Sequence, residues 1–283
     1  MDIRCLERKD IPQALALCSQ VGWNHTEADW LRVMALQPQG CIGGYVGGVL
    51  MATCTVVGFG PVGWVGVFLV DESLRGKGEG QRLFAAMLEA ADRLGIRTLG
   101  LDSSDAGRPI YLKFGFQMTA VGNELWGGPN GGGRLHPDVT PLEERDWDSL
   151  MALDRGAVDA DRARQLRLLS AEPGAAACVV RRQGGVEGFG FSRPGKLSGV
   201  IGPVVADSFD SARILIESLV AARRERDGER GVSLAVLEQS ALKEWLAGNG
   251  FQLRRRNIRM FRPAARPVFG GDRTFVSTAL GMG

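Results

Sequence analysis

Apolar and polar positions in the first half of the chain follow two periods. Some stretches repeat apolar residues every three or four positions, as a helix with one buried face does, and others are short β-branched runs typical of buried strands. The elements predicted in this way are helices at 10–20 and 79–94, a hairpin at 41–57 that turns at Gly47-Gly48, strands at 65–70 and 98–102, a short helix ending at 111–113, and a strand from Phe116. This order predicts a mixed α and β fold with largely buried strands.

The same landmarks occur twice in the chain. The segment LERKDIPQALAL returns as LEERDWDSLMAL, so that Leu6 corresponds to Leu142, and Gly115-Phe116 returns as Gly250-Phe251. Such collinear matches predict two copies of one fold, and the glycine-rich run between them predicts a linker. The expected division is a first domain at 1–126, a linker at 127–136 and a second domain at 137–283.

Composition limits the partners of the protein. The 283 residues are 45% hydrophobic and 23% charged, which is typical of a globular protein. The net charge of +2 is too small to make nucleic acid or an anionic membrane an expected partner. Residues 33–70 carry no charge, but glycines interrupt them too often for a membrane span. We therefore expect a cytoplasmic protein.

Metal chemistry is not favoured by the sequence. The chain has two histidines, His25 and His136, and five cysteines without a CxxC pair, so the usual ligand sets are missing. The polar amino terminus does not resemble a secretory signal. We expect reduced cysteines and no metal site.

The clearest chemical signal is the glycine-rich turn Arg75-Gly76-Lys77-Gly78-Glu79-Gly80, between a predicted strand and a predicted helix. Backbone N–H groups at the start of a helix attract phosphate oxygens, and glycines let the backbone approach them. A Walker loop would need serine or threonine after Lys77, and a dinucleotide fingerprint would need a glycine at Gln81 or Leu83. The turn therefore predicts pyrophosphate binding outside both of those classes.

This turn and the segment Tyr111-Leu112-Lys113-Phe114-Gly115-Phe116 resemble the GCN5-related N-acetyltransferase (GNAT) superfamily. The family has an Arg/Gln-x-x-Gly-x-Gly/Ala loop and a Tyr-x-x-x-Gly-Phe segment. The first copy resembles a GNAT domain over nearly its whole length, and the pair of copies resembles bacterial tandem-GNAT proteins with a divergent second domain. The resemblance implies two tandem domains of α/β (α+β mixed) class, each a mostly antiparallel central sheet flanked by helices.

The resemblance also implies an acyltransferase that moves the acetyl group of acetyl-CoA to a primary amine by direct attack in a ternary complex. Backbone N–H groups of the strand would polarise the thioester carbonyl, as in an oxyanion hole. Tyr111 matches the general acid of the family. The cofactor-binding residues implied in this way are Phe68, Leu69, Val70, Arg75, Gly76, Lys77, Gly78, Glu79 and Gly80.

The general base and the acceptor site are less defined by the sequence. Asp102 ends a predicted strand and either faces the cleft as a base or caps the next turn. Trp23, His25 and Glu27 lie where a GNAT domain usually shapes its acceptor site, and the competing interpretation is helix capping and packing. An ordered water could also remove the proton.

The second copy looks degenerate. The alignment of the two copies places the loop opposite a segment that contains no glycine, Ser211-Ala212-Arg213-Ile214-Leu215-Ile216. It also places Trp245 near the position of Tyr111. We expect this copy not to bind CoA in the usual way, and either to be structural or to complete the acceptor pocket. Its basic run Arg254-Arg255-Arg256 with Arg259 indicates either an anionic partner or side chains in solvent.

Three functions stay open at this point. The first is an N-acetyltransferase for a small-molecule amine, with no nucleic acid and no membrane as partner. The second is a non-catalytic acetyl-CoA sensor, and the third is an enzyme that acetylates a protein amino terminus or lysine. Oligomeric state is not determined by the sequence, and a homodimer is left open.

Overall fold

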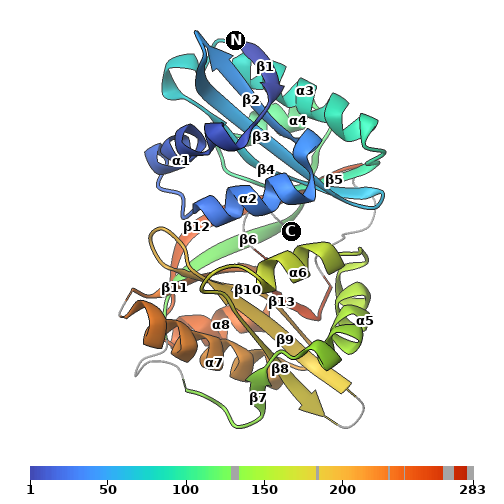
Figure 1. Cartoon of the computed structure of the whole chain (residues 1–283), viewed down its shortest axis with the longest axis vertical. Coiled ribbons are helices and arrows are strands. Elements are labelled where there is room, and N and C mark those ends of the chain that lie inside the picture. The colour runs from blue at the N-terminus through green and yellow to red at the C-terminus, as the bar shows by residue number, and fades with distance from the viewer. Residues whose placement is uncertain (129–133, 183–184, 229, 239, 264–270, 279–283) are drawn as a thin grey trace.

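The computed structural model describes residues 1–128, 134–182, 185–228, 230–238, 240–263 and 271–278, and it has two similar α/β halves, one above the other in Figure 1. The first half contains β1 (Asp2–Cys5), α1 (Ile11–Gln20), α2 (Glu27–Leu36), β2 (Cys41–Val46), β3 (Val49–Phe59), β4 (Val62–Val70), α3 (Glu79–Arg93), β5 (Thr98–Ser103), α4 (Arg108–Lys113) and β6 (Gln117–Gly127). The second half contains β7 (Val139–Pro141), α5 (Trp147–Val158), α6 (Ala163–Ser170), β8 (Ala176–Arg182), β9 (Gly185–Arg193), β10 (Gly199–Ala206), α7 (Phe209–Asp227), β11 (Val232–Leu237), α8 (Ala241–Gly248), β12 (Gln252–Arg262) and β13 (Thr274–Val276).

The predicted elements and the internal repeat are confirmed. Both copies begin with a strand, a short 3-10 turn and a helix, and each turn is closed by a capping box, Glu7 with Asp10 and Glu143 with Asp146. The helix α2 was not among the predicted elements. It starts with a capping box of Thr26 and Asp29 and begins inside the segment that the sequence assigned to the acceptor site, at Glu27.

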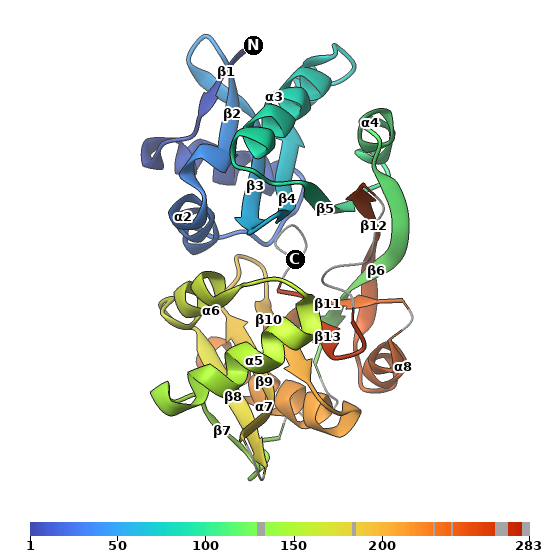
Figure 2. The ribbon, with the colours of Figure 1, turned by 90° about the vertical axis from the view of Figure 1, so that its right-hand side faces the viewer.

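The two halves exchange their last strands. In the single sheet, β12 of the second half lies between β5 and β6, and β6 of the first half lies between β12 and β11. Figure 2 shows both strands running from one half to the other. Each copy of the fold is therefore completed by a strand of the other copy. The predicted linker at 127–136 begins at the last residue of β6, Gly127, and its residues 129–133 lie outside the described residues.

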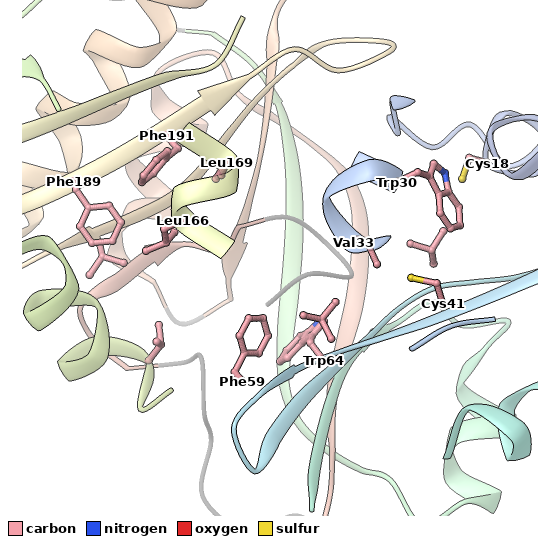
Figure 3. Close-up of a cluster of buried hydrophobic side chains, with 14 of the residues drawn as sticks. Cys18, Trp30, Val33, Cys41, Phe59, Trp64, Leu166, Leu169, Phe189 and Phe191 are labelled. Carbon is pink, nitrogen blue, oxygen red and sulfur yellow. The ribbon is translucent and has the colours of Figure 1, made fainter. Parts of the chain in front are cut away.

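A hydrophobic core cluster extends across both halves. Figure 3 shows Trp30 and Val33 of α2 on one side and Phe189 and Phe191 of β9 on the other, with Phe59 between them. Two further clusters lie under α3 and under α7. Apolar burial that continues from one half to the other stabilises their relative arrangement.

All five cysteines are free. Cys18, Cys41 and Cys54 are buried, as expected for core residues, whereas Cys5 is exposed and Cys178 is half-buried. Within the described parts of the chain, no helix is both long and apolar enough to cross a membrane.

Candidate active site

The strands β4 and β5 separate from each other halfway along β4. They pair in parallel from Val62 with Thr98 to Val65 with Leu101, and the described residues show no β5 partner for β4 beyond that point. A bulge follows at Val67, which has a φ of +44° and whose carbonyl oxygen accepts a hydrogen bond from Thr53 Oγ1 (2.8 Å). The bulge turns β4 away from β5 and leaves a strand edge with free backbone groups.

The glycine-rich loop lies at the far end of this open edge. Gly76 and Gly78 have φ values of +74° and +80°, and a Cβ added at either would meet no atom within 4 Å. The helix α3 begins at Glu79, directly after them. Open space above backbone N–H groups at a helix start fits a pyrophosphate, and left-handed backbone explains the two glycines.

Gly80 has a different role. A Cβ there would lie 3.3–3.5 Å from side chains of Ile110, Val70 and Phe68, so the first turn of α3 packs closely against β4 and α4. Arg75 Nε donates to the Val70 carbonyl oxygen (3.0 Å), which ties the loop to the end of β4. Lys77 is exposed beside the loop.

Tyr111 lies on α4 among aromatic rings. Its ring centroid is 5.8 Å from that of Phe68 and 5.1 Å from that of Phe84. A Cβ at Gly107 would come within 2.9 Å of the tyrosine ring, so glycine is required for this close approach. Burial, with a smaller contribution from Cys54, raises the pKa of the Tyr111 phenol above its usual value. The phenol is therefore protonated at neutral pH and able to donate a proton.

A cavity of about 120 Å³ lies between the two halves. It starts at the bulge of β4 and at Tyr111, and the second half supplies its opposite wall through β9, β10, β11 and β12. Its charged and polar lining residues are Asn24, His25, Asp29, Asp102, Ser104, Glu124, Arg193, Ser233, Arg255 and Asn257.

The fold brings four of the five catalytic and acceptor-site candidates to this cavity, together with Phe68. Trp23, His25, Phe68, Asp102 and Tyr111 all line it. Glu27 is exposed as the first residue of α2 and is absent from the cavity wall formed by the described residues. The cofactor-binding candidates from 69 to 80 follow Phe68 along β4 to the loop, outside the cavity itself.

Asp102 is held by the second half. Its carboxylate oxygens accept hydrogen bonds from Arg259 Nε (3.0 Å) and Nη2 (3.2 Å), and its side chain is 1% exposed. Arg259 lies on β12 and also donates to Ser277 Oγ (3.2 Å). The exchanged strand therefore fixes this carboxylate in place.

His25 lies beside a buried ion cluster. Its ring stacks at 5.4 Å on that of Trp23. Burial lowers the pKa of the imidazole, and although Asp29 opposes this shift, Arg193 and Arg32 add to it. The imidazole is therefore neutral at neutral pH, and its buried Nδ1 has no hydrogen-bond partner among the described residues.

Asp29 is the centre of that cluster. Its Oδ1 lies 2.6 Å from Arg32 Nη2 and 3.0 Å from Arg193 Nη1. Burial alone would raise the pKa of Asp29, but the two guanidinium groups hold it well below its usual range. Arg32 also pairs with Glu172. The cluster joins α2 of the first half to β9 of the second.

Of the second-half residues of the cavity, the sequence singled out Arg255, as part of the basic run, but not Arg193 or Asn257. Arg193 ends an ordinary strand, and Asn257 lies within β12 behind the basic run. Nothing in the local sequence distinguishes them. They reach the cavity because β12 pairs with β5 and because the halves face each other across it.

The second half has no counterpart of the loop in its described residues. The helix α7 begins at Phe209, directly after its cap Ser208, so Ser211–Ile216 lie within the helix and their predicted alignment with the loop is wrong. The carboxylate of Glu187 accepts hydrogen bonds from Ser211 Oγ (2.8 Å) and Ser208 Oγ (3.3 Å) at the start of this helix. An acidic side chain already lies where a phosphate would bind.

The counterpart of Tyr111 is Leu246, not Trp245. Phe116 N donates to the Tyr111 carbonyl oxygen (3.1 Å), and Phe251 N donates to the Leu246 carbonyl oxygen at the same distance. Leu246 is buried in the core of the second half. A leucine has no proton to donate, so this half lacks an acid at the equivalent position.

In the second half, the strand β13 fills the gap between two strands that separate from each other, β10 and β11. The strands β10 and β11 pair at Gly199 with Val232 and at Val200 with Ser233, and then separate as β4 and β5 do. Beyond that point β13 pairs antiparallel with β10, and Ser277 N donates to the Ala235 carbonyl oxygen of β11 (2.9 Å). The chain itself occupies the space that is open in the first half.

Metal ligands are not gathered at either gap. Among the residues with described positions, no three His, Cys, Asp or Glu side chains lie close enough together to hold an ion.

Comparison with known proteins agrees with this geometry. Two family models, each described as an acetyltransferase (GNAT) domain, match residues 52–125 and 150–270. The chain is 26% identical to the uncharacterized N-acetyltransferase YitH of Bacillus subtilis (strain 168), over 98% of this chain and 97% of that protein.

Solved structures show the same fold. A putative acetyltransferase from Pyrococcus horikoshii has a TM-score of 0.83 at 21% identity, covering 100% of this chain and 95% of that one. A tandem GNAT protein from the clavulanic acid biosynthesis pathway has a TM-score of 0.64 at 15% identity, covering 92% and 97%. With its two GNAT domains and its two matching halves, the chain belongs to the GNAT family as a tandem GNAT protein and is an acyltransferase.

Proposed function

We propose that the protein transfers the acetyl group of acetyl-CoA to a primary amine by direct attack in a ternary complex, and that the first half performs the chemistry. The observation that carries this proposal is the continuous path from the loop at Gly76 and Gly78, along the open edge of β4, to Tyr111 and the cavity. The described residues of the second half have neither the loop nor the tyrosine, and β13 fills their gap.

In this proposal, the loop holds the pyrophosphate and the open edge of β4 from Phe68 to Val70 lies beside the pantetheine arm. Acetyl-CoA supplies the activated acyl group when bound. Backbone N–H groups at the bulge of β4 would stabilise the negative charge that develops on the carbonyl oxygen. Because these groups are fixed before the reaction begins, they need little reorganisation.

The amine nitrogen attacks the thioester carbonyl carbon, the new C–N bond forms and the C–S bond breaks. Tyr111 donates its phenolic proton to the departing sulfur. His25 accepts the proton that the amine loses, since its imidazole is neutral and its Nδ1 is unbonded among the described residues. The products are an N-acetyl amide and the free thiol of CoA, and both side chains then exchange protons with water.

Asp102 lines the same cavity, but both of its carboxylate oxygens already accept hydrogen bonds from Arg259. We therefore assign it to holding β12 against β5, and assign proton acceptance to His25. A water molecule between His25 and the amine would serve the same purpose.

The size of the cavity favours a small-molecule amine over a protein acceptor. A volume of about 120 Å³ corresponds to roughly ten water positions. Both halves wall it, and Asn24 of the first half is bound to Ser198 of the second (Nδ2 to O, 3.0 Å). Tyr111 favours an enzyme over an acetyl-CoA sensor, which would need the loop but no proton donor.

The experiment that tests the proposal is calorimetric titration of acetyl-CoA into the full chain and its Gly78→Glu variant. A glutamate at a φ of +80° strains the loop and adds negative charge beside the pyrophosphate. We expect one site per chain, weakened by about 10³-fold in the variant. Release of CoA thiol in the presence of primary amines then tests transfer.

The matched control is Gly228→Glu. Gly228 has a φ of +69° at the end of α7, and a Cβ there would also meet no atom within 4 Å. This variant has the same kind of backbone strain but lies outside the loop. Its affinity for acetyl-CoA should therefore stay within about twofold of that of the parent chain. No binding by the folded parent chain, or equal weakening in both variants, would overturn the proposal.

A further inference from the structure

The second-half wall of the cavity carries hydrogen-bond donors that have no acceptor. Arg193 and Asn257 line the cavity and are 4% and 5% exposed. Arg193 Nε and Asn257 Nδ2 have no hydrogen-bond partner among the described residues. Buried N–H groups are nearly always paired in folded proteins, so two unpaired donors at one cavity indicate a ligand with acceptor oxygens.

Arg193 is held in position for such a ligand. Its Nη1 lies 3.0 Å from Asp29 Oδ1, and Asp29 is itself fixed by Arg32 (2.6 Å) and by the backbone N–H of Thr26 (2.8 Å). One side of the guanidinium is therefore anchored while Nε is left for another partner. A donor that is already fixed loses little conformational entropy when it binds an anion.

A second cation lies on the same face of β12 as Asn257. Arg255 precedes Asn257 by two residues, lines the cavity, and has Glu124 Oε2 at 3.8 Å from its Nε, beyond hydrogen-bond distance. Its neighbours in the basic run point elsewhere, because Arg254 lies over the Trp126 ring at 3.5 Å and Arg256 is 63% exposed.

The charge of the cavity limits the kind of anion. Asp29, Asp102 and Glu124 line it together with two arginines, Arg193 and Arg255, so the described lining has one more negative than positive charge and disfavours a dianion such as a phosphate monoester more than a monoanion. A carboxylate has a single negative charge and two acceptor oxygens. It matches the two unpaired donors and the nearby guanidinium of Arg255.

We propose that the acceptor is an amino acid or a similar amine that carries a carboxylate, and that Arg193, Asn257 and Arg255 bind this carboxylate. The amine end would then lie toward Tyr111 and His25, on the other side of the cavity. This inference rests on the proposed acetyltransferase function and names the class of its substrate.

The test measures release of CoA thiol by the full chain at saturating acetyl-CoA. The acceptors are the common free amino acids, β-alanine and γ-aminobutyrate. Each is compared with its own amide and with the corresponding amine that lacks the carboxyl group. Amidation removes the charge and keeps the size. We expect kcat/KM for the best carboxylate-bearing amine to exceed that of its amide by at least about tenfold.

Two variants locate the effect. Asn257→Asp keeps the shape of the side chain and replaces the donor by a repelling carboxylate. Arg255→Ala removes the partly exposed cation with little risk to the fold. Each should raise KM for the carboxylate-bearing amine by about tenfold and change KM for its amide by less than about twofold. Arg256→Ala, an exposed arginine of the same strand, is the control and should change neither.

Each outcome decides between the two proposals. An amide or a carboxyl-free amine that reacts as well as the amino acid overturns the inference and leaves the acetyltransferase function standing. An equal rise in KM for the carboxylate-bearing amine and for its amide in the Asn257 and Arg255 variants also overturns it, since it indicates a structural role. Absence of transfer to every amine overturns both, because the inference depends on that function.

Discussion

The two gaps in the sheet differ although the fold around them is repeated. In the first half, β4 and β5 separate, and no strand of the described residues pairs between them as far as the loop before α3. In the second half, β10 and β11 separate in the same way, but β13 lies between them and α7 starts without a loop. The same splayed strands thus border an open edge in one copy, among the described residues, and are part of the core in the other.

The splayed pair is therefore a property of the fold, whereas its capacity to bind a ligand depends on which residues occupy the space between the two strands. An open strand edge has unpaired backbone groups that need partners. A bound pantetheine arm satisfies them in the proposed function of the first half, and the chain's own β13 satisfies them in the second. The second half can therefore supply a wall of the cavity without a ligand in its own gap.

The largest effect is expected from removing β13 from its gap. Val276 of β13 pairs with Val204 of β10 and is fully buried in the core cluster of the second half, and Val276→Asp places a charge there. We expect a loss of about 3 kcal/mol in the free energy of unfolding, measured by urea denaturation. Acetyl-CoA should still bind at one site per chain, because the second half has no loop.

The control for this substitution is Val49→Asp at the start of β3, where valine is 53% exposed. Its free energy of unfolding should change by no more than about 0.5 kcal/mol. A second acetyl-CoA site in Val276→Asp would show that β13 alone distinguishes the two gaps, contrary to our comparison.

Tyr111→Phe tests the other difference between the halves. It removes one hydroxyl and keeps the ring among Phe68 and Phe84, as Leu246 keeps an apolar side chain in the second half. We expect kcat, measured from steady-state rates, to fall by about 10²-fold. The affinity for acetyl-CoA, measured by calorimetry, should stay within about twofold of the parent value.

Tyr45→Phe is the matched control, since Tyr45 is the other tyrosine of the chain. Its hydroxyl donates to Asp10 Oδ2 (2.8 Å), away from the cavity. Its loss should reduce the free energy of unfolding by about 1 kcal/mol and leave kcat unchanged. An unchanged kcat in Tyr111→Phe would remove Tyr111 from the mechanism.

The smallest expected effect concerns pH. Burial lowers the pKa of His25 in the folded protein below its value in the unfolded chain, so below about pH 6.5 the unfolded state binds more protons. Stability should fall as the pH drops from 7 to 5, by no more than about 1.4 kcal/mol per pH unit from this group. Asp29, whose pKa is lowered, loses its contribution only as its carboxylate titrates below about pH 4.

Urea denaturation at pH 7, 6 and 5 measures this dependence. His25→Gln should flatten it between pH 7 and 5, and His136→Gln controls for the loss of one histidine from the chain. Equal flattening in both variants would contradict the assignment to His25.

Local patterns predicted much of the first half. The apolar stripe of α3 and the Gly47-Gly48 turn between β2 and β3 are fixed by neighbours in the sequence, so their periodicity and turn chemistry were sufficient. The helix α2 was not predicted from the sequence. Its start is marked by a capping box, Thr26 with Asp29, which lies inside the segment that was assigned to the acceptor site. Trp23 and His25 nevertheless line the cavity just before it.

The second copy shows where alignment by offset fails. The strands β4 and β10 end at equivalent positions, Val70 and Ala206, but the first copy has a loop between its strand and the next helix and the second copy does not. A constant offset therefore placed Ser211–Ile216 at the loop. The hydrogen bonds of Phe116 and Phe251 identify the equivalent positions correctly, because backbone geometry persists where side chains have changed.

Sequence patterns were sufficient to predict the two copies, their order of elements, the loop with its three glycines, and the tyrosine that follows it. These features are local, because each depends on residues within a few turns or strands of one another. The exchange of β6 and β12, the pairing of Arg259 with Asp102, the position of β13 in the second gap, and the place of Arg193 and Asn257 in the cavity wall become visible in the folded chain alone. Pairing between strands more than a hundred residues apart depends on the register of the whole sheet, which short-range sequence patterns do not specify.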